Sequence, residues 1–220
     1  MPVYNEAKTV REIIEQVLAV EANKELIVVD DASTDGSREI VDSLRHPDLK
    51  VLHHARNQGK GAALATGFRE VTGDIVIIQD ADLEYLPSEY PKLVEPIIQG
   101  KADVVYGSRF MGGTHRVLLF WHFVGNKLVT TVSNMLTNLN LSDMETCYKV
   151  FRAELLEGVT FRSKRFGFEP EFTVKMAKKG CRFYEVPISY HGRGYEDGKK
   201  ITWRDGLAAL FHIVRFRLWD

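Results

Sequence analysis

The stretch that most constrains the fold is a run of four branched apolar residues, IVII, at positions 75–78. A strand on a protein surface alternates polar and apolar side chains, whereas this run has no polar face for water. Such a run is typical of a strand that is buried on both faces of a parallel sheet. It therefore predicts a strand of this kind within an α/β domain.

Short apolar runs alternate with amphipathic segments through the first half of the chain. The runs predict strands at residues 26–29, 51–52, 75–78 and 103–106, and the segments between them predict helices. This alternation indicates βαβ units, and so a mostly parallel sheet flanked by helices. The first visible element is a helix with an apolar stripe from Val10 to Leu18, and Asn5 is its expected cap. Because an α/β chain usually opens on a strand, we expect the first strand to be missing or shortened.

Another helix is expected to begin at Pro87. Its expected inward-facing residues are Tyr90, Leu93, Val94, Ile97 and Ile98. The second half of the chain predicts helices at about 120–138, 168–179 and 203–218, with strands before residue 152 and at 182–190. The apolar side chains of the last helix are Trp203, Leu207, Leu210, Phe211 and Val214. Packing on the core is the favoured interpretation of this face, and contact with an anionic membrane surface is the alternative.

Composition narrows the classes of protein that remain. A chain of 220 residues with 45% apolar residues fits one compact domain, in which residues 111–220 cover the strand ends of residues 1–110. A net charge of −1 and no nucleic-acid-binding motif argue against nucleic acid as a partner. Cys147 and Cys181 are far apart, which suits a reducing cytosol. No apolar run reaches the ~20 residues that span a bilayer, so we expect a cytoplasmic protein.

Asp80 and Asp82 follow the buried strand directly. Two carboxylates at the carboxyl end of a strand repel each other unless a cation lies between them, and ligands of open α/β sheets bind at that end. Mg²⁺ and Mn²⁺ prefer oxygen ligands, which they share with substrate phosphates. The pair therefore suggests a site for a metal and a diphosphate. Taken alone, D-x-D is better explained as a turn with a helix cap.

Two neighbouring strand ends carry further polar clusters, Asp30-Asp31 and Gly107-Ser108-Arg109. Because strand ends of one parallel sheet converge, the three clusters together indicate a site. A carboxylate of the first cluster would suit ribose hydroxyls or a base N–H, whereas Asp35 is better explained as a helix cap. Gly59-Lys60-Gly61 at a helix start could bind phosphate. Its spacing matches neither the dinucleotide fingerprint nor the Walker loop.

A set of motifs then occurs in a fixed order from Pro2 to about Trp203: PVYNE, VVDDASTDGS, NQGKGAA, DADLEY, GSRF, SDMETCYKVFR and EVPISYHGRGYEDGKK. In these motifs the chain resembles glycosyltransferase family 2, and within it the branch of dolichyl-phosphate mannosyltransferases and bacterial polyprenyl-phosphate glycosyltransferases. The resemblance implies a GT-A (Rossmann-like) fold, a nucleotide-diphosphate sugar donor and a divalent metal, Mg²⁺ or Mn²⁺. It also implies inversion of the anomeric centre.

The resemblance implies roles for particular residues. It implies a nucleotide-sugar site at Pro2, Tyr4, Glu6, Asp30, Asp31, Lys60, Asp80, Ala81, Arg193, Lys199 and Lys200. It implies a metal bound by Asp82 with help from Asp80 and Glu84, and an acceptor phosphate held by Arg109 and Arg116. The catalytic residues would be Asp82, Arg109 and Asp143. The usual R-x-x-G-x-S-K loop is replaced here by RGYEDGKK, so either lysine of that loop could reach the phosphates.

The acceptor stays open at this point. A polyprenyl phosphate is already an anion and needs only positioning, whereas a sugar hydroxyl needs a general base, either Asp143 or Glu145. For Asp143 a structural role in its turn is an equal alternative. A third class is an inactive nucleotide-binding homologue, because loss of the first strand would leave a large unfilled slot in the sheet. A polyprenyl-phosphate acceptor would place the protein on the inner face of the membrane, and a homo-oligomer is compatible with the sequence. The sugar and the base, as in GDP-mannose or UDP-glucose, are not distinguished.

Overall fold

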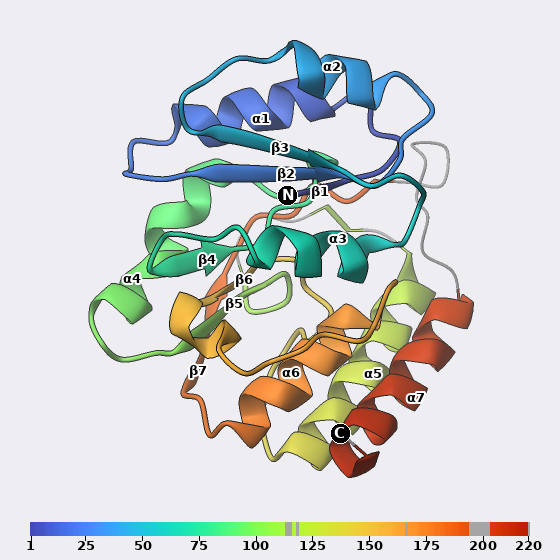
Figure 1. Cartoon of the computed structure of the whole chain (residues 1–220). Helices are drawn as coiled ribbons and strands as arrows, with labels where there is room; N and C mark the ends of the chain where they lie inside the picture. The colour runs from blue at the N-terminus through green and yellow to red at the C-terminus, as the bar shows by residue number, and fades with distance from the viewer. Residues whose placement is uncertain (113–115, 118, 166, 194–202, 220) are drawn as a thin grey trace.

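The computed structural model describes residues 1–112, 116–117, 119–165, 167–193 and 203–219 (Figure 1). Strands and helices alternate regularly as far as residue 108. These elements are β1 (Pro2–Val3), α1 (Val10–Ala19), β2 (Leu26–Asp30), α2 (Ser37–Ser43), β3 (Leu49–His53), α3 (Lys60–Phe68), β4 (Ile75–Ile77), a 3₁₀ turn (Pro87–Glu89), α4 (Tyr90–Ile98) and β5 (Val104–Ser108). The remaining elements are α5 (Phe120–Thr137), β6 (Lys149–Arg152), a 3₁₀ turn (Ala153–Leu156), α6 (Phe168–Lys178), β7 (Phe183–Pro187) and α7 (Trp203–Trp219).

The strands form two sheets rather than one. The first has the order β1-β2-β3 and is entirely parallel. The second has the order β4-β6-β5-β7, in which β6 runs antiparallel to β4 and β5, and β7 runs parallel to β5. The predicted α/β fold with a mostly parallel sheet is confirmed. So is a shortened first strand, because β1 has only two residues.

Helices cover the sheets in groups (Figure 1). α1 and α2 lie together on one side of the β1–β3 sheet, and α5, α6 and α7 lie together at the opposite end of the molecule. The core is fully buried at Ile13 and Ile14 of α1, Val28 of β2, Tyr106 of β5 and Phe172 of α6. Each of these positions belongs to an apolar stripe or run, so burial follows the hydrophobic pattern of the sequence.

Three local predictions are wrong. Asn5 does not cap the first helix, which begins at Val10 after Thr9; Asn5 instead takes a left-handed conformation with φ 54° inside the preceding turn. Asparagine tolerates that region better than most residues. Ile98 was expected to face inward but is 71% exposed at the last turn of α4.

The third correction concerns α7. Its buried side chains are Ala209, Ile213 and Phe216, whereas Leu207 and Phe211 of the predicted inward face are mostly exposed. Several apolar residues therefore lie on the outside of this helix, and the preference for packing that whole face on the core was incorrect. The side chain of Trp203 lies outside the described residues.

Candidate nucleotide-sugar and acceptor site

The turn after β1 and the loop after β4 meet at one arginine. Arg193 Nη1 lies 3.0 Å from Glu6 Oε2, and Arg193 Nη2 lies 3.1 Å from Asp82 Oδ2. The Arg193 backbone N–H donates to Glu84 Oε1 at 2.8 Å. The structure thus brings together Glu6, Asp82, Glu84 and Arg193, which lie up to 187 positions apart in the chain.

The turn that carries Glu6 is itself fixed by the segment after β2. The Asn5 N–H donates to Ser33 Oγ at 3.0 Å, and Asn5 Oδ1 accepts from the Thr34 N–H at 2.8 Å. Asp35 accepts hydrogen bonds from the N–H groups of Ala7 and Ser37, each at 3.0 Å. Asp35 therefore holds the start of α2 against this turn, in agreement with the structural role favoured for it.

Asp82 has a strongly perturbed carboxyl group. Burial, together with the nearby carboxylates of Asp80 and Glu84, raises the pKa of Asp82 to about 7, whereas Arg193 acts in the opposite direction. A hard cation would relieve this crowding of carboxylates. Among the described residues, no three side chains with metal-ligand chemistry form a ready cluster. The donor set still fits Mg²⁺ or Mn²⁺, because such ions are often held by one or two carboxylates together with substrate phosphates.

The backbone of the loop is strained next to Asp82. Leu83 has φ 61°, a region that leucine rarely occupies. The Glu84 N–H that follows donates to Asp82 Oδ1 at 3.2 Å. Strained residues of this kind cluster at binding and catalytic sites, where the surrounding structure holds them in place. The conformation of Leu83 therefore supports a functional role for this loop.

Asp80 points to a different partner from Asp82. Lys60 Nζ lies 3.0 Å from Asp80 Oδ2 and also 3.0 Å from Glu169 Oε1. Burial would lower the pKa of Lys60, but the two carboxylates outweigh burial and hold that pKa well above its usual value. The ammonium is thus shared between two carboxylates. The carbonyl oxygen of Ala81, which follows Asp80 in the chain, accepts a hydrogen bond from Thr9 Oγ1 at 2.7 Å.

Asp31 is occupied by protein groups. Asp31 Oδ1 accepts from the Gln58 N–H at 2.9 Å, and Oδ2 accepts from the Gly59 N–H at 2.7 Å. His54 Nδ1 also lies 2.7 Å from Asp31 Oδ1. Its neighbour Asp30 accepts from the Ser33 N–H at 3.2 Å. Both carboxylates are buried and tie loops of the first sheet together.

The glycine turn before α3 is packed against another segment. Gly59 has φ 93°, and a Cβ at that position would lie 2.1 Å from the carbonyl oxygen of Lys164. A Cβ at Gly61 would lie 2.1 Å from the carbonyl oxygen of Ser163. Both glycines are therefore required for close approach of two backbones. The start of α3 faces residues 163–165.

On the other side of the site, Arg109 and Asp143 form a buried pair with two hydrogen bonds. Arg109 Nε donates to Asp143 Oδ2 at 2.6 Å, and Nη2 donates to Oδ1 at 2.8 Å. Asn126 Nδ2 and the Arg109 backbone N–H donate to the same carboxylate at 3.1 and 3.2 Å. Burial would raise the pKa of Asp143, but Arg109 outweighs it, so that pKa lies below its usual value.

Tyr190 joins the two sides of the site. Its hydroxyl donates to Glu84 Oε2 at 2.9 Å, and the guanidinium carbon of Arg109 lies 5.1 Å from the centroid of its ring. The Arg116 N–H donates to the Tyr190 carbonyl oxygen at 3.0 Å. Arg109 is therefore a neighbour of the Asp82 loop, as the convergence of strand ends predicted, and the backbone of Arg116 joins the same tyrosine. Lys199 and Lys200 lie outside the described residues.

Sequence reasoning overlooked several residues here. Lys127 Nζ lies 4.9 Å from the ring centroid of Phe110 and donates to the Ser142 carbonyl oxygen at 2.9 Å. Glu185 on β7 accepts from the Ser142 N–H at 2.8 Å and so fixes the turn before Asp143. Nothing in the spacing of these residues connects them. Only the adjacency of β5 and β7 could have indicated Glu185.

A second buried carboxyl group lies close to this pair. Burial, aided by the carboxylate of Glu169, raises the pKa of Glu145 to about 8. One oxygen of Glu145 has no hydrogen-bond partner among the described residues. The buried ammonium of Lys149 is held by the carbonyl oxygens of Met144 and Thr146. Glu145 is thus a carboxyl group whose proton could be exchanged near neutral pH.

Known proteins resemble this chain in sequence. Residues 1–160 match the family model described as Glycosyl transferase family 2. The chain is 30% identical to an undecaprenyl-phosphate mannosyltransferase of Micrococcus luteus, with 99% of this chain and 97% of that protein covered. It is 29% identical to a dolichol-phosphate mannosyltransferase of Pyrococcus furiosus, over all of this chain and 63% of that protein.

Among solved structures, glucosyl-3-phosphoglycerate synthase of Mycobacterium tuberculosis superposes with a TM-score of 0.75 at 20% identity, covering 99% of this chain and 76% of that one. A second structure of that enzyme, in complex with Mn²⁺, UDP and glucosyl-3-phosphoglycerate, also gives 0.75, at 18% identity and with 98% and 77% covered. At this identity the likeness concerns the fold alone. The chain belongs to glycosyl transferase family 2, and it is a glycosyltransferase with the GT-A fold.

Proposed function

We propose that this enzyme transfers mannose from a nucleotide-diphosphate sugar to a polyprenyl phosphate. The relatives named above supply the class of acceptor and the sugar. The observation that carries the proposal is the state of Asp143, whose carboxylate is buried and already accepts four hydrogen bonds from Arg109 and Asn126. A carboxylate held in this way is a poor general base. An acceptor phosphate needs no deprotonation, so Asp143 can serve to position Arg109.

The surroundings of Arg109 suit a phosphate with a hydrocarbon tail. Phe110 lies between the two cations, with its ring centroid 5.5 Å from the Arg109 guanidinium carbon and 4.9 Å from Lys127 Nζ. The ring of Phe123 on α5 lies 5.3 Å from that of Phe110. Other α5 side chains are apolar and exposed, among them Trp121 at 78%. Cations beside exposed aromatic side chains can hold a phosphate and the start of its polyprenyl chain.

The same side chains support a position at the membrane surface. Residues 120–137 contain no acidic side chain, and α7 beside α5 also exposes large apolar residues (Figure 1). Tryptophan and tyrosine favour the interface between lipid and water. Within the described part of the chain, no helix is long and apolar enough to cross a bilayer. We infer peripheral contact through the exposed residues of α5 and α7.

For the donor, we propose that Asp82 and Asp80 hold a divalent metal, with Glu84 nearby. Such a metal would neutralise charge that develops on the leaving nucleoside diphosphate. Arg193 would contribute a second positive charge at the same diphosphate, because its guanidinium lies between Glu6 and Asp82. Lys199 and Lys200 of the following loop would add to it. Attack by the acceptor phosphate on the sugar would invert the anomeric centre.

A second candidate function follows from Glu145. With a pKa of about 8, this carboxyl could act as the base for a saccharide hydroxyl. The buried position of its unpartnered oxygen makes that function the weaker candidate.

The test is transfer of labelled mannose from GDP-mannose in the presence of Mn²⁺. The acceptors are a short polyprenyl phosphate, the matching polyprenol and an oligosaccharide. We expect product with the phosphate only, and a Glu145→Gln variant that retains most activity. We expect Asp143→Asn to raise the KM for the acceptor without a new pKa in the pH profile, because it positions Arg109. Transfer to the oligosaccharide, lost by ~10²–10⁴ in Glu145→Gln, would establish the second function instead.

A further inference from the structure

The segment that follows β7, residues 188–193, crosses the candidate site, and we call it the bridging segment. The Ile188 N–H donates to the Ser108 carbonyl oxygen at 3.0 Å, which continues the parallel pairing of β7 with β5. The Ser189 N–H donates to the buried carboxylate of Glu89, at 3.1 Å from one oxygen and 3.2 Å from the other. The start of the bridging segment is therefore fixed by β5 and by the 3₁₀ turn before α4.

Glu84, in the loop after β4, holds the rest of the bridging segment through three oxygens. Its carbonyl oxygen accepts from the His191 N–H at 3.0 Å, and its Oε1 accepts from the Arg193 N–H at 2.8 Å. Its Oε2 accepts from the Tyr190 hydroxyl at 2.9 Å. Each oxygen of this carboxylate thus has a protein donor, and the side chain is only 13% exposed. Glu84 is the anchor that fixes the backbone at Arg193.

The side chain of Tyr190 has different partners at its ring and at its hydroxyl. The guanidinium carbon of Arg109 lies 5.1 Å from the ring centroid, and Asp143 holds the same guanidinium through two hydrogen bonds. A cation over the face of an aromatic ring is attracted by the ring. The hydroxyl reaches Glu84 and, through Glu84, the backbone of Arg193. Phenylalanine would supply the ring alone, so one substitution separates the two contacts.

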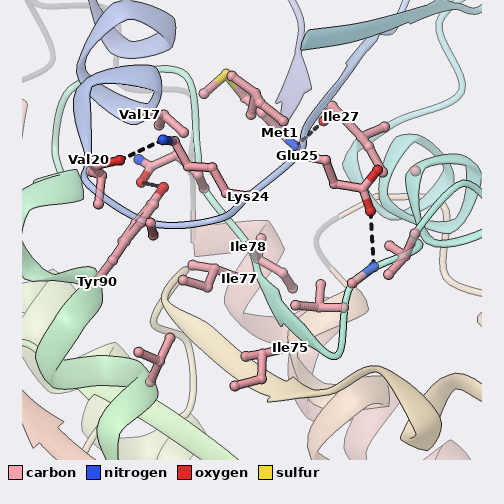
Figure 2. Close-up of a pocket in the computed structure, with 18 of the residues that line it drawn as sticks. Met1, Val17, Val20, Lys24, Glu25, Ile27, Ile75, Ile77, Ile78 and Tyr90 are labelled. Atoms are coloured by element: carbon pink, nitrogen blue, oxygen red, sulfur yellow. Dashed lines mark hydrogen bonds between the residues drawn. The ribbon is translucent and has the colours of Figure 1, made fainter. Parts of the chain in front are cut away.

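A row of buried tyrosines supports the ring of Tyr190 from the interior. The ring centroids of Tyr190 and Tyr85 lie 5.4 Å apart, those of Tyr85 and Tyr148 4.8 Å, and those of Tyr148 and Tyr90 5.9 Å. The hydroxyls of Tyr90 and Tyr148 both donate to Gln79 Oε1, at 2.7 and 2.8 Å. At the far end of the row, Tyr90 borders an apolar cavity of about 880 Å³ (Figure 2). Tyr190 is therefore packed against side chains that are themselves fixed.

We propose that Tyr190 is a positioning residue for both substrates of the transfer, an assignment that rests on the proposed function. Its ring holds the guanidinium of Arg109 where the acceptor phosphate binds. Its hydroxyl, acting through Glu84, holds Arg193 beside the donor diphosphate. Tyr190 itself contacts neither reacting group. Since transfer needs the two reactants in a near-attack arrangement, one rigid side chain between the two arginines sets how acceptor and donor lie relative to each other.

The protonation state of Tyr190 suits this role. Burial, together with Glu84, raises the pKa of the Tyr190 phenol above its usual value, although Arg109 acts in the opposite direction. The phenol therefore keeps its proton at neutral pH and donates it to the hydrogen bond with Glu84. A rival role, in which the hydroxyl exchanges a proton with a substrate, would instead require a pKa nearer to neutral pH.

The first experiment measures steady-state transfer of mannose from GDP-mannose, with Mn²⁺, to a short polyprenyl phosphate. Tyr190→Phe should raise the KM for GDP-mannose by at least ~5-fold and change the KM for the acceptor by less than ~2-fold, because it removes only the hydroxyl. Tyr190→Leu should raise both KM values by at least ~5-fold, because it also removes the ring. Tyr184→Phe on β7 is the control, since this tyrosine is 44% exposed, and it should change neither KM.

A double-variant cycle tests the link through Glu84. Tyr190→Phe combined with Glu84→Gln should raise the KM for GDP-mannose no further than the more affected single variant does. Additive effects would overturn the link. Unchanged KM values in Tyr190→Phe would overturn the assignment, and a fall in kcat alone, with loss of an ionisation from the pH profile, would show proton transfer by the hydroxyl in its place.

A second experiment needs no transfer, so it separates this assignment from the proposed function. In the ligand-free protein, amide hydrogen exchange at Arg193 should be at least ~5-fold faster in Tyr190→Phe, because its N–H is held by Glu84. Exchange at Ile188, which is held by β5, should stay within ~2-fold. Unchanged exchange at Arg193 would overturn the assignment even in an enzyme that transfers mannose. Faster exchange at Arg193 in an enzyme that transfers no mannose would support the link from Tyr190 to Arg193 and overturn the proposed function.

Discussion

Lys60 offers the sharpest test of how the site is held together. Its ammonium lies 3.0 Å from a carboxylate oxygen of Asp80 and 3.0 Å from one of Glu169, and the three side chains are only 17%, 21% and 6% exposed. Lys60→Met keeps the apolar length of the side chain and removes the charge. Two carboxylates then face each other in a largely buried place, without a cation.

Removal of one partner from a buried ion pair destabilises a protein by ~3–5 kcal/mol. Lys60 and Asp80 retain some contact with solvent, so we take the lower end, about 3 kcal/mol. For a chain of this size, that corresponds to a fall of roughly 6–12 °C in the unfolding midpoint. Urea denaturation at pH 7 measures the difference. Lys50→Met is the matched control, because the Lys50–Glu70 pair lies on the surface with side chains 50% and 37% exposed. It should change stability by less than ~1 kcal/mol.

The pH dependence distinguishes lost charge from lost packing. In the unaltered protein, burial would raise the pKa of Asp80, but the charge of Lys60 outweighs burial and holds that pKa below its usual value. The Asp80 carboxylate therefore stabilises the fold above pH ~4, and this stabilisation is lost as the pH falls. In Lys60→Met the pKa of Asp80 should rise above the unfolded value, and protonation then relieves the repulsion. The difference between the two proteins should be largest at neutral pH and shrink below pH ~4. A constant difference, or one no larger than that of Lys50→Met, would refute the reasoning.

Three further predictions use other parts of the structure. The Met1 amino group has a pKa of about 6 in the folded protein, against 8.0 for an unperturbed amino group, so stability should rise by about 2 kcal/mol from pH 5.5 to 8.5, and N-terminal acetylation should abolish that rise in urea denaturation. Trp121→Ser should leave stability within ~0.5 kcal/mol but reduce sedimentation with anionic vesicles severalfold, unlike Ile98→Ser, which alters a similarly exposed residue of α4, outside the proposed contact. Gly59→Ala should lower the unfolding free energy by more than ~2 kcal/mol, because its Cβ would meet a backbone carbonyl at 2.1 Å. Gly36→Ala is strained in φ but has open space around the new Cβ, so it should lower the unfolding free energy by only ~1 kcal/mol. Equal losses for the two variants would contradict the packing argument.

Much of the fold could be predicted because the signals are local. The run at 75–78 became β4, and the apolar stripe from Val10 became the buried face of α1. The antiparallel β6 between β4 and β5 could not be predicted, since pairing of Val76 with Phe151 depends on contacts far apart in the chain. The exposed side of α7 was misjudged for a related reason. Periodicity gives the apolar face of a helix, but neighbouring helices decide which residues are covered.

The candidate site likewise has residues whose placement the sequence could predict and residues whose placement it could not. The convergence of Asp82 and Arg109 follows from the ends of parallel strands, which a sequence reveals. One of the two partners of Lys60, in contrast, is Glu169 on α6, and no spacing connects these two residues. Asp31 was expected at a ribose or base and is held by backbone N–H groups of the 58–59 turn. Its role at the nucleotide stays a prediction.

The division into two sheets also determines how the protein unfolds locally. A continuous sheet transmits a local opening to all its strands, whereas here, in the described part of the chain, the β1–β3 layer with α1 and α2 is not hydrogen-bonded through strands to the other sheet. We therefore expect two cooperative units that open with different free energies. Glu6 belongs to one unit, and Asp82 belongs to the other. A donor nucleotide that contacts both residues would bind only when the two units are packed together. Its binding free energy would therefore stabilise the packed arrangement of the two units, and with it the whole domain.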